Sequence, residues 1–300
     1  MYKPCYLTTG DRIRIISPAG GISVEKVSLG IEDLHAEGFE VQLGDHVFDR
    51  HFRFAGSDEQ RLANLQEAFD DEGCKAIICS RGGYGTIRLI PHLDLTKFRK
   101  NPKWLVGFSD ITILHVALQN IGFCSIHGSM PGSYFSEDFK TQSYTELLKM
   151  LKGEDNSIIV PYNENNRNGV AIGQVVGGNL SILYSLLGTH LDLDTEHKIL
   201  FIEDVGEYLY HIDRMMWSMK YSGKLEKLAG LVVGGFSRVK DTESQFGQKV
   251  EGIIKNVVKE YRYPVCFDFP AGHIDVNLPV MLGSNYSMEV GDIVKFSKLP

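Results

Sequence analysis

The chain has 300 residues, 43% of them hydrophobic, and a formal net charge of −7 at pH 7. This length and composition can bury a large core, in one large domain or in two of moderate size. The acidic balance, without any cluster of lysine and arginine, gives no reason to expect nucleic acid as a partner. No stretch approaches the roughly 20 apolar residues of a spanning helix, and no signal peptide is recognisable, so we expect no membrane partner.

Cysteine usage indicates a reducing compartment. The five cysteines are odd in number and contain no C-x-x-C pair: Cys5, Cys74, Cys79, Cys124 and Cys266. Cys79 and Cys266 lie in apolar, strand-like runs, so we expect buried free thiols. Together with the absence of a targeting segment, this predicts a cytoplasmic protein.

The first half of the chain alternates short apolar runs with helical patterns. Strands are expected at 12–17, 39–43, 76–79 and 104–106, and helices at 24–38, from 57 onward and at 110–118. Ser57 and Gln60 are spaced as a capping box at the start of the second helix. This βαβα order predicts a mostly parallel sheet flanked by helices, with ligands at the carboxyl ends of the strands.

The second half predicts a separate α/β domain rich in β-strands. A polar, less regular segment covers 136–164, and we expect an interdomain linker at 151–169 between domains at 1–150 and 170–300. Strands are expected at 198–202, 228–235 and 263–267, and the tail at 280–283 and 287–290 predicts antiparallel strands with glycine turns.

Ser109 lies where an apolar strand gives way to a helix. Gly107 permits a sharp turn, and Asp110 opens a segment with apolar side chains at helical spacing. A serine at such a junction has the position of a nucleophile elbow, in which the next backbone N–H helps to hold an oxyanion. The usual second glycine of an elbow is replaced by Ile111. A plain helix N-cap explains the same pattern equally well.

A glycine-rich turn, 81–85, follows the strand at 76–79. Its glycines can bring bare backbone amides close to a ligand, either as an oxyanion donor or as a phosphate cradle. It lacks the Gly-Lys-Ser/Thr of a P-loop and the spacing of a dinucleotide fingerprint. A simple tight turn is the alternative.

Glu203 and His273 each follow a predicted strand. A carboxylate can orient a histidine, and a histidine in a Pro-Ala-Gly-His loop suits general-base chemistry. A helix-capping acid and a structural histidine are the alternatives. The order serine, glutamate, histidine is one of the known orders of a triad. His115 and His127 lack a third metal ligand at suitable spacing, so metal chemistry is not favoured.

Seven blocks of residues resemble, in the same order, the LD-carboxypeptidases, the serine peptidase family S66 that includes muramoyltetrapeptide carboxypeptidase and the microcin C7 immunity protein. The resemblance covers nearly the whole chain, from about Asp11 to Gly283. One departure is Ser129, where the family usually has proline after His-Gly. The blocks are 54–61, 81–85, 107–110, 127–128, 177–180, 202–204 and 272–273.

The resemblance implies a role for each motif residue. Ser109 is the nucleophile, His273 the general base and Glu203 the acid that orients the histidine, with Glu207 as a rival four residues away. The backbone amides of Asp110 and Gly83 form the oxyanion hole, although Gly82 is an alternative to Gly83. The N-terminal domain then carries the nucleophile, and the C-terminal domain supplies the acid and the base.

The implied reaction is release of the terminal D-alanine from a muropeptide tetrapeptide through an acyl-enzyme, without metal or cofactor. Arg81 and Arg214 are candidates for binding the terminal carboxylate because they neighbour the motif loops. The resemblance also implies a homodimer. Alternatives are a hydrolase of peptidyl or aminoacyl nucleotides, as in the microcin immunity branch, and a non-catalytic muropeptide-binding protein.

Overall fold

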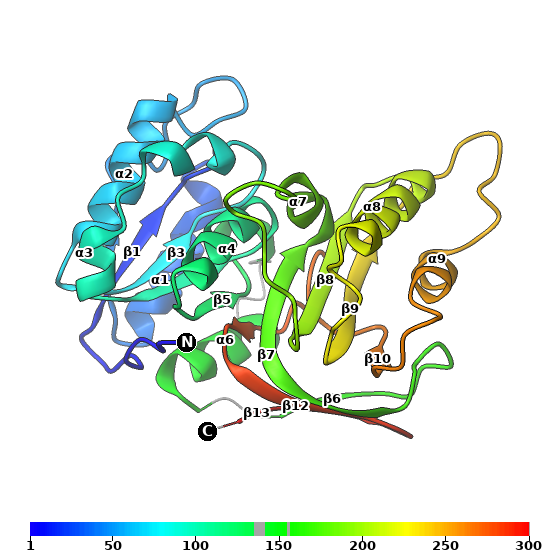
Figure 1. Cartoon of the computed structure of the whole chain (residues 1–300). Coiled ribbons are helices and arrows are strands. Elements are labelled where there is room, and N and C mark those ends of the chain that lie inside the picture. The colour runs from blue at the N-terminus through cyan, green and yellow to red at the C-terminus, as the bar shows by residue number, and fades with distance from the viewer. Residues whose placement is uncertain (135–141, 155–156, 300) are drawn as a thin grey trace. The chain divides into compact units, whose positions relative to one another are not determined.

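A computed structural model describes residues 1–134, 142–154 and 157–299 (Figure 1). The chain divides into two compact units. The first, here the N-unit, comprises Met1–Asp155 and Leu278–Val280; the second, the C-unit, comprises Asn156–Asn277 and Met281–Pro300. Each unit has its own sheet with helices packed on it, which confirms the predicted α/β fold class.

The N-unit is built on a six-stranded sheet in the order β11-β5-β4-β3-β1-β2. The pairings from β2 through β5 are all parallel, as the alternating sequence pattern predicts. The strands are β1 (Arg12–Ile16), β2 (Glu40–Leu43), β3 (Cys74–Cys79), β4 (Trp104–Gly107), β5 (Ser125–His127) and β11 (Val280–Leu282).

The place of β11 corrects the prediction for the C-terminal tail. This strand lies beside β5, whereas the next one, β12 (Asn285–Val290), joins the sheet of the C-unit. The expectation of antiparallel strands is confirmed for 287–290, because β12 pairs antiparallel with both of its neighbours in that sheet. Residues Val280–Leu282 instead lie in the other sheet, apart from β12. A short apolar run such as Val-Met-Leu fits a strand of either sheet, so the sequence could not assign it to one of them.

One face of the N-unit sheet is covered by α2, α3 and α4. Their buried side chains, including Leu65, Phe98 and Leu114, share a cluster with Ile77 and Leu105 of the strands. The capping box predicted at Ser57 and Gln60 is present at the start of α2 and is confirmed. The N-unit helices are α1 (Glu25–Ala36), α2 (Asp58–Asp70), α3 (Thr96–Lys100), α4 (Thr112–Asn120), α5 (Pro131–Tyr134) and α6 (Gln142–Lys152).

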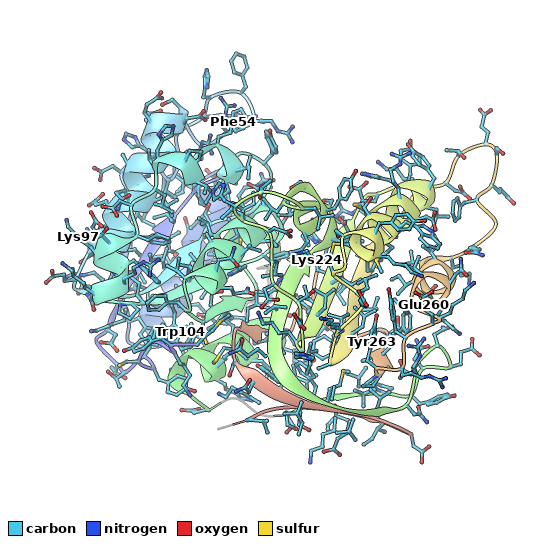
Figure 2. All side chains as sticks on the ribbon, viewed as in Figure 1. Phe54, Lys97, Trp104, Lys224, Glu260 and Tyr263 are labelled. Atoms are coloured by element: carbon cyan, nitrogen blue, oxygen red, sulfur yellow. The ribbon has the colours of Figure 1, made fainter. Side chains whose placement is uncertain are left out.

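Trp104 fixes the start of the N-unit chain on its sheet. Trp104 lies on β4 of the N-unit (Figure 2). Its ring is fully buried, and its Nε1 donates to the Cys5 carbonyl at 2.9 Å. Tyr6 stacks on the same ring at 6.1 Å between centroids. A buried indole that satisfies its N–H in this way ties the N-terminal segment down.

The C-unit contains a seven-stranded sheet in the order β10-β9-β8-β7-β12-β13-β6. The pairings from β7 to β10 are parallel, and those of β12 with β7 and β13 and of β13 with β6 are antiparallel. The strands not yet given are β6 (Ile158–Val160), β7 (Gly169–Asn179), β8 (Ile199–Val205), β9 (Gly230–Ser237), β10 (Val265–Cys266) and β13 (Val294–Lys298).

Helices α7 (Leu180–Ser185), α8 (Leu209–Tyr221) and α9 (Val250–Val257) complete the C-unit, and α8 contacts both of the others. Three features were not anticipated. Strand β8 continues past residue 202 through Val205, and the segment expected to be irregular at 136–164 contains α6 and β6, apart from residues outside the described ranges. Short elements flanked by polar residues leave little periodicity to detect.

The cysteines are free thiols, and all but the exposed Cys5 are buried. The expectation for Cys79 and Cys266 is therefore confirmed, and burial raises the pKa of both thiols. In the described ranges, no helix has the length and apolar character needed to cross a membrane.

Candidate active site

Ser109 occupies a strained backbone conformation at the end of β4. Phe108 is extended, with φ −155° and ψ −172°, and the chain then turns at Ser109 with φ 65° into the short helix η3 (Ser109–Ile111). A left-handed conformation costs a non-glycine residue roughly 1–2 kcal/mol. Such strain at a strand-to-helix junction is typical of a nucleophile elbow.

The helix-cap alternative for Ser109 does not agree with this geometry. Ser109 is the first residue of η3, the N-cap position belongs to Phe108, and that of α4 belongs to Ile111. Neither cap involves a side-chain hydrogen bond. The hydroxyl is therefore not engaged in capping either helix.

A buried histidine supports the backbone just before Ser109. His115 on α4 is fully buried, with Nε2 2.8 Å from the Gly107 carbonyl and Nδ1 2.8 Å from Ser125 Oγ. A carbonyl can only accept, so Nε2 donates and Nδ1 accepts from the serine hydroxyl. Burial lowers the pKa of His115 to about 4, which keeps the ring neutral.

The glycine-rich turn lies directly against the serine. A Cβ on Gly82 would be 2.7 Å from Ser109 Cβ and 3.0 Å from its Oγ, so only glycine fits there. The Gly82 carbonyl accepts from Gly20 N at 3.1 Å. Because a trans peptide holds C=O and the following N–H on opposite sides, the Gly83 N–H points away from Gly20.

The backbone amides of Asp110 and Gly83 are the candidate oxyanion donors near Ser109. The Asp110 N–H lies in the first turn of η3, where no intrahelical acceptor is available. The Gly83 N–H donates no hydrogen bond to any of the described residues. Its φ of 123° is one that side chains rarely adopt.

The Asp110 carboxylate joins the turn to the serine junction, a role that the sequence reasoning missed. Its Oδ2 accepts from Thr86 N at 2.9 Å, at the start of the helix η1 (Thr86–Arg88) that follows the glycines. Burial raises the pKa of Asp110, and the Thr86 hydrogen bonds oppose that shift. An acid in the first turn of a helix suggests only a favourable charge, so the long-range contact was not foreseen.

Residues of the block at 54–61 pack against the glycine-rich turn. Arg61 is fully buried, where it donates to the Pro18 carbonyl at 2.6 Å and pairs with Asp58. Its guanidinium lies 5.0 Å from the centre of the Phe54 ring. A Cβ on Gly85 would be 2.8 Å from Arg61 Nη1, so a larger residue at Gly85 would collide with this arginine.

In the C-unit, the structure brings Glu203 and His273 together. Glu203 is fully buried in β8, and its Oε2 lies 2.6 Å from His273 Nδ1 and accepts from the His273 backbone N–H at 3.2 Å. A Cβ on Gly272 would be 2.7 Å from Glu203 Cβ, so the glycine before the histidine allows this approach. The two residues are 70 positions apart in the chain.

The neighbouring acids have other partners. Asp204 accepts from the backbone N–H groups of Ser181 and Val205, and burial together with the charge of Glu203 raises its pKa to about 7. Glu207 lies 2.5 Å from His211, one helical turn away. Of the two rival acids, the structure therefore pairs Glu203, and not Glu207, with His273.

Both acids are buried because β8 lies inside the sheet of the C-unit, where every residue from Ile199 to Asp204 is buried. Successive side chains of the strand therefore enter covered faces on both sides of the sheet. The register with β9 shifts between Ile202 and Asp204, and a bulge of this kind re-aims the side chains beside it.

The two candidate arginines differ in their surroundings. Arg81 lines a cavity of about 430 Å³ in the N-unit and donates to the Gly21 carbonyl at 3.0 Å. Arg214 is exposed on α8, with its guanidinium 5.3 Å from the centre of the Tyr210 ring. Of the two candidate arginines, only Arg81 therefore lines this cavity. Across the part of the chain that the structure describes, no group of three or more His, Cys, Asp or Glu side chains could hold a metal ion.

Comparisons with known proteins agree with the resemblance. Sequence profiles of the LD-carboxypeptidase N-terminal domain and C-terminal domain match residues 13–128 and 172–288. A probable murein peptide carboxypeptidase of Bacillus subtilis (strain 168) is 35% identical over 97% of this chain and 92% of its own length.

Solved structures extend the likeness to the fold. The crystal structure of muramoyltetrapeptide carboxypeptidase from Oxalobacter formigenes is 30% identical and has a TM-score of 0.89, covering 96% of this chain and 99% of its own. The microcin C7 self immunity protein MccF has a TM-score of 0.87 at 20% identity, over 99% of this chain and 98% of its own. The latter similarity concerns the fold alone.

Proposed function

The chain belongs to the LD-carboxypeptidase family, and we propose that it is a serine carboxypeptidase that releases the terminal D-alanine of murein tetrapeptides. The named activities of the Bacillus and Oxalobacter relatives support this substrate class. Ser109, Glu203 and His273 are the proposed triad, and no metal or cofactor takes part.

The proposal rests mainly on the left-handed backbone conformation of Ser109 at the junction of β4 and η3 and on the close packing of Gly82 against its side chain. A helix needs no strained serine at this position, because neither cap uses it. Strain of this kind persists where a reacting side chain must be held in one direction.

In the proposed reaction, Ser109 Oγ attacks the carbonyl between the diamino acid and D-alanine. His273 takes the serine proton on Nε2, because its Nδ1 is turned to Glu203, and passes that proton to the leaving amine of D-alanine. Water, deprotonated by the same histidine, then hydrolyses the acyl-enzyme and regenerates the Ser109 hydroxyl. The Asp110 and Gly83 amides stabilise the tetrahedral oxyanion, each by about 3 kcal/mol.

The decisive experiment compares wild type with Ser109→Ala. The wild type and the variant are incubated with a panel of tetrapeptides carrying meso-diaminopimelate or lysine at the third position, and the products are identified by mass spectrometry. We expect wild type to release D-alanine and Ser109→Ala to release none while keeping a wild-type melting temperature. Release of D-alanine at the wild-type rate by Ser109→Ala would contradict the proposal.

Ser244→Ala is the matched control, because Ser244 is an exposed loop serine of the C-unit and its removal should leave turnover unchanged. Adding an aminoacyl nucleotide to the panel separates the immunity-type alternative. Saturable binding of tetrapeptide by wild type without any product would instead identify a binding protein.

A further inference from the structure

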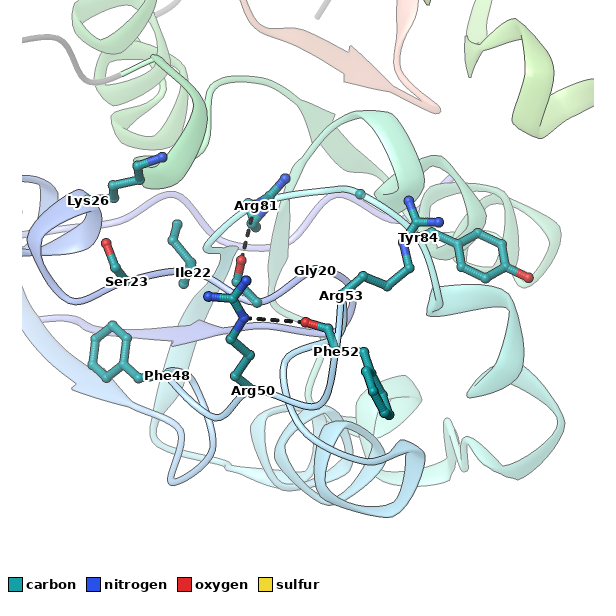
Figure 3. Close-up of a pocket in the computed structure, with 12 residues that line it drawn as sticks. Gly20, Ile22, Ser23, Lys26, Phe48, Arg50, Phe52, Arg53, Arg81 and Tyr84 are labelled. Atoms are coloured by element: carbon teal, nitrogen blue, oxygen red, sulfur yellow. Dashed lines mark hydrogen bonds between the residues drawn. The ribbon is translucent and has the colours of Figure 1, made fainter.

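The N-unit contains a cavity whose charged lining is entirely basic. It has a volume of about 430 Å³, and Lys26, Arg50, Arg53 and Arg81 line it (Figure 3). These four cations come from three separate segments of the chain: α1, the loop between β2 and α2, and the glycine-rich turn. Their gathering at one cavity is therefore a product of the fold, and no sequence cluster announced it.

The cations are not neutralised within the described part of the chain. None of the four takes part in an ion pair with a described acidic side chain. Arg81 is held by the Gly21 carbonyl at 3.0 Å and Arg50 by the Phe52 carbonyl at 3.3 Å, both neutral acceptors (Figure 3). Each arginine has five N–H donors, so these contacts orient the guanidinium and leave donors for a ligand.

The acidic residues that neighbour these cations in the sequence have other hydrogen-bond partners. Asp49, beside Arg50, lies 2.8 Å from His46 Nδ1 and accepts from Gln60 Nε2 at 2.9 Å. Glu25, beside Lys26, is hydrogen-bonded to the Ser23 side chain. Neither acid lines the cavity. Four like charges that line one cavity without ion-pair partners among the described side chains repel one another, and an anionic ligand would relieve that repulsion.

The cavity adjoins the proposed nucleophile within the same unit. Gly83 lines it, and the preceding Gly82 is the residue that packs against Ser109. The guanidinium of Arg81 lies against Gly20, where a Cβ would be 3.2 Å from its Nε. A ligand with its anionic group in this cavity would therefore lie against Gly83, next in the chain to the glycine that packs on Ser109.

We propose that Lys26, Arg50, Arg53 and Arg81 form a binding site for an anionic group of the substrate, a carboxylate of the peptide or a phosphate joined to it. This inference rests on the proposed function, because it assigns a specificity site to that same reaction. Arginine and lysine bind such oxygens through charge-assisted hydrogen bonds, and paired arginines add geometric selectivity.

The test removes two of the charges without touching the glycine-rich turn. Arg50→Gln/Arg53→Gln is made in the Ser109→Ala background, and binding of the tetrapeptide is measured by calorimetry at low and at physiological salt. We expect affinity to fall about 10- to 100-fold, the loss associated with charge-assisted hydrogen bonds. Both arginines are exposed, so the melting temperature should not change.

Arg99→Gln/Lys100→Gln is the matched control, because it removes the same charge from exposed positions on α3 of the same unit. We expect it to leave the affinity at physiological salt unchanged, since the charges of distant surface residues are screened there. An equal loss of affinity in both double variants would overturn the proposal.

Three further ligands identify the anionic group. They are the tetrapeptide with its glutamyl carboxylate amidated, the tetrapeptide with its terminal carboxylate amidated, and a tetrapeptide linked to a sugar phosphate. If the site binds a carboxylate, the tetrapeptide in which that carboxylate is amidated will bind equally weakly to the Ser109→Ala protein and to its Arg50→Gln/Arg53→Gln variant. If a phosphate is bound, only the sugar-phosphate ligand will lose affinity in that variant. Unchanged affinity for all ligands would overturn the proposal.

Failure of this proposal and failure of the proposed function give different results. Binding is measured with the Ser109→Ala protein and needs no turnover, whereas the function is tested by D-alanine release from wild type. Normal D-alanine release by wild type, together with unchanged affinity of the double variant for every one of these ligands, would discard the anion site alone.

Discussion

The two proposed halves of the catalytic apparatus are held in place by different means. Around Ser109 the structure fixes the backbone: a left-handed residue, a glycine pressed against it and a buried histidine bonded to the preceding carbonyl. Around His273 it fixes a side chain, through one buried carboxylate that accepts both the ring and the backbone N–H. The comparison indicates that the nucleophile is positioned through its backbone and the base through its side chain.

The largest effect is expected from Glu203→Gln, which tests whether this carboxylate positions His273. If the Glu203 carboxylate orients His273, its replacement by a neutral amide should lower kcat about 10⁴-fold, as for the corresponding acid of a serine-protease triad. The fold should survive, because the substitution removes a fully buried charge. The measurement is the steady-state rate of D-alanine release.

Glu207→Gln provides the control for this prediction. Glu207 contacts His211, so its replacement should leave kcat near that of wild type. A strong loss in Glu207→Gln together with a weak loss in Glu203→Gln would reverse the assignment of the acid.

The support beneath Ser109 should appear as a pH dependence of stability. His115 has a pKa of about 4 in the folded chain against an ordinary value of 6.5, so the unfolded chain takes up a proton first as the pH falls. The contribution of His115 to the free energy of unfolding is therefore full above pH 6.5. It falls by about 3 kcal/mol as the pH decreases from 6.5 to 4.

Urea unfolding between pH 4 and 7, followed by the fluorescence of Trp104 in a Trp217→Phe background, measures this loss in the N-unit. His115→Gln should remove the corresponding part of the pH dependence, whereas replacement of the exposed His92 by glutamine should retain it. An identical slope in wild type and His115→Gln would show that the histidine is not held neutral.

A smaller effect is expected from Gly82→Ala. The new methyl group would meet Ser109 Cβ at 2.7 Å, so the serine or the turn must shift by a few tenths of an ångström or more. We expect kcat/KM to fall about 100-fold with little change in melting temperature, because displaced reacting groups lose near-attack geometry. Gly252→Ala on α9 is the control, since its new Cβ would meet only Gln248 Cβ at 3.7 Å. Wild-type kcat/KM in Gly82→Ala would mean that the close approach has no catalytic role.

Local features of the N-unit could be predicted from the sequence, and contacts across the chain could not. The capping box at Ser57 depends on residues three apart, and the Ser109 junction on a strand, a glycine and a helix in sequence. The approach of His273 to Glu203 spans 70 residues; their positions after two strands indicated that they could meet, and the resemblance implied that they do.

The same distinction explains what the sequence reasoning missed. The basic cavity draws its lining from three segments, so no stretch of sequence carries enough positive charge to reveal it. The bulge at the end of β8 and the contact of Asp110 with Thr86 depend on register and on tertiary packing, which periodicity does not report.

The position of β11 affects how the protein can be made. Residues Leu278–Val280 belong to the N-unit, although the rest of that unit ends at Asp155. During synthesis the edge of β5 therefore stays open until residue 280 has left the ribosome, while more than a hundred intervening residues emerge. An open strand edge invites pairing with other chains. The order of biosynthesis thus leaves this edge of the N-unit sheet available to other chains until the short strand β11 has been made.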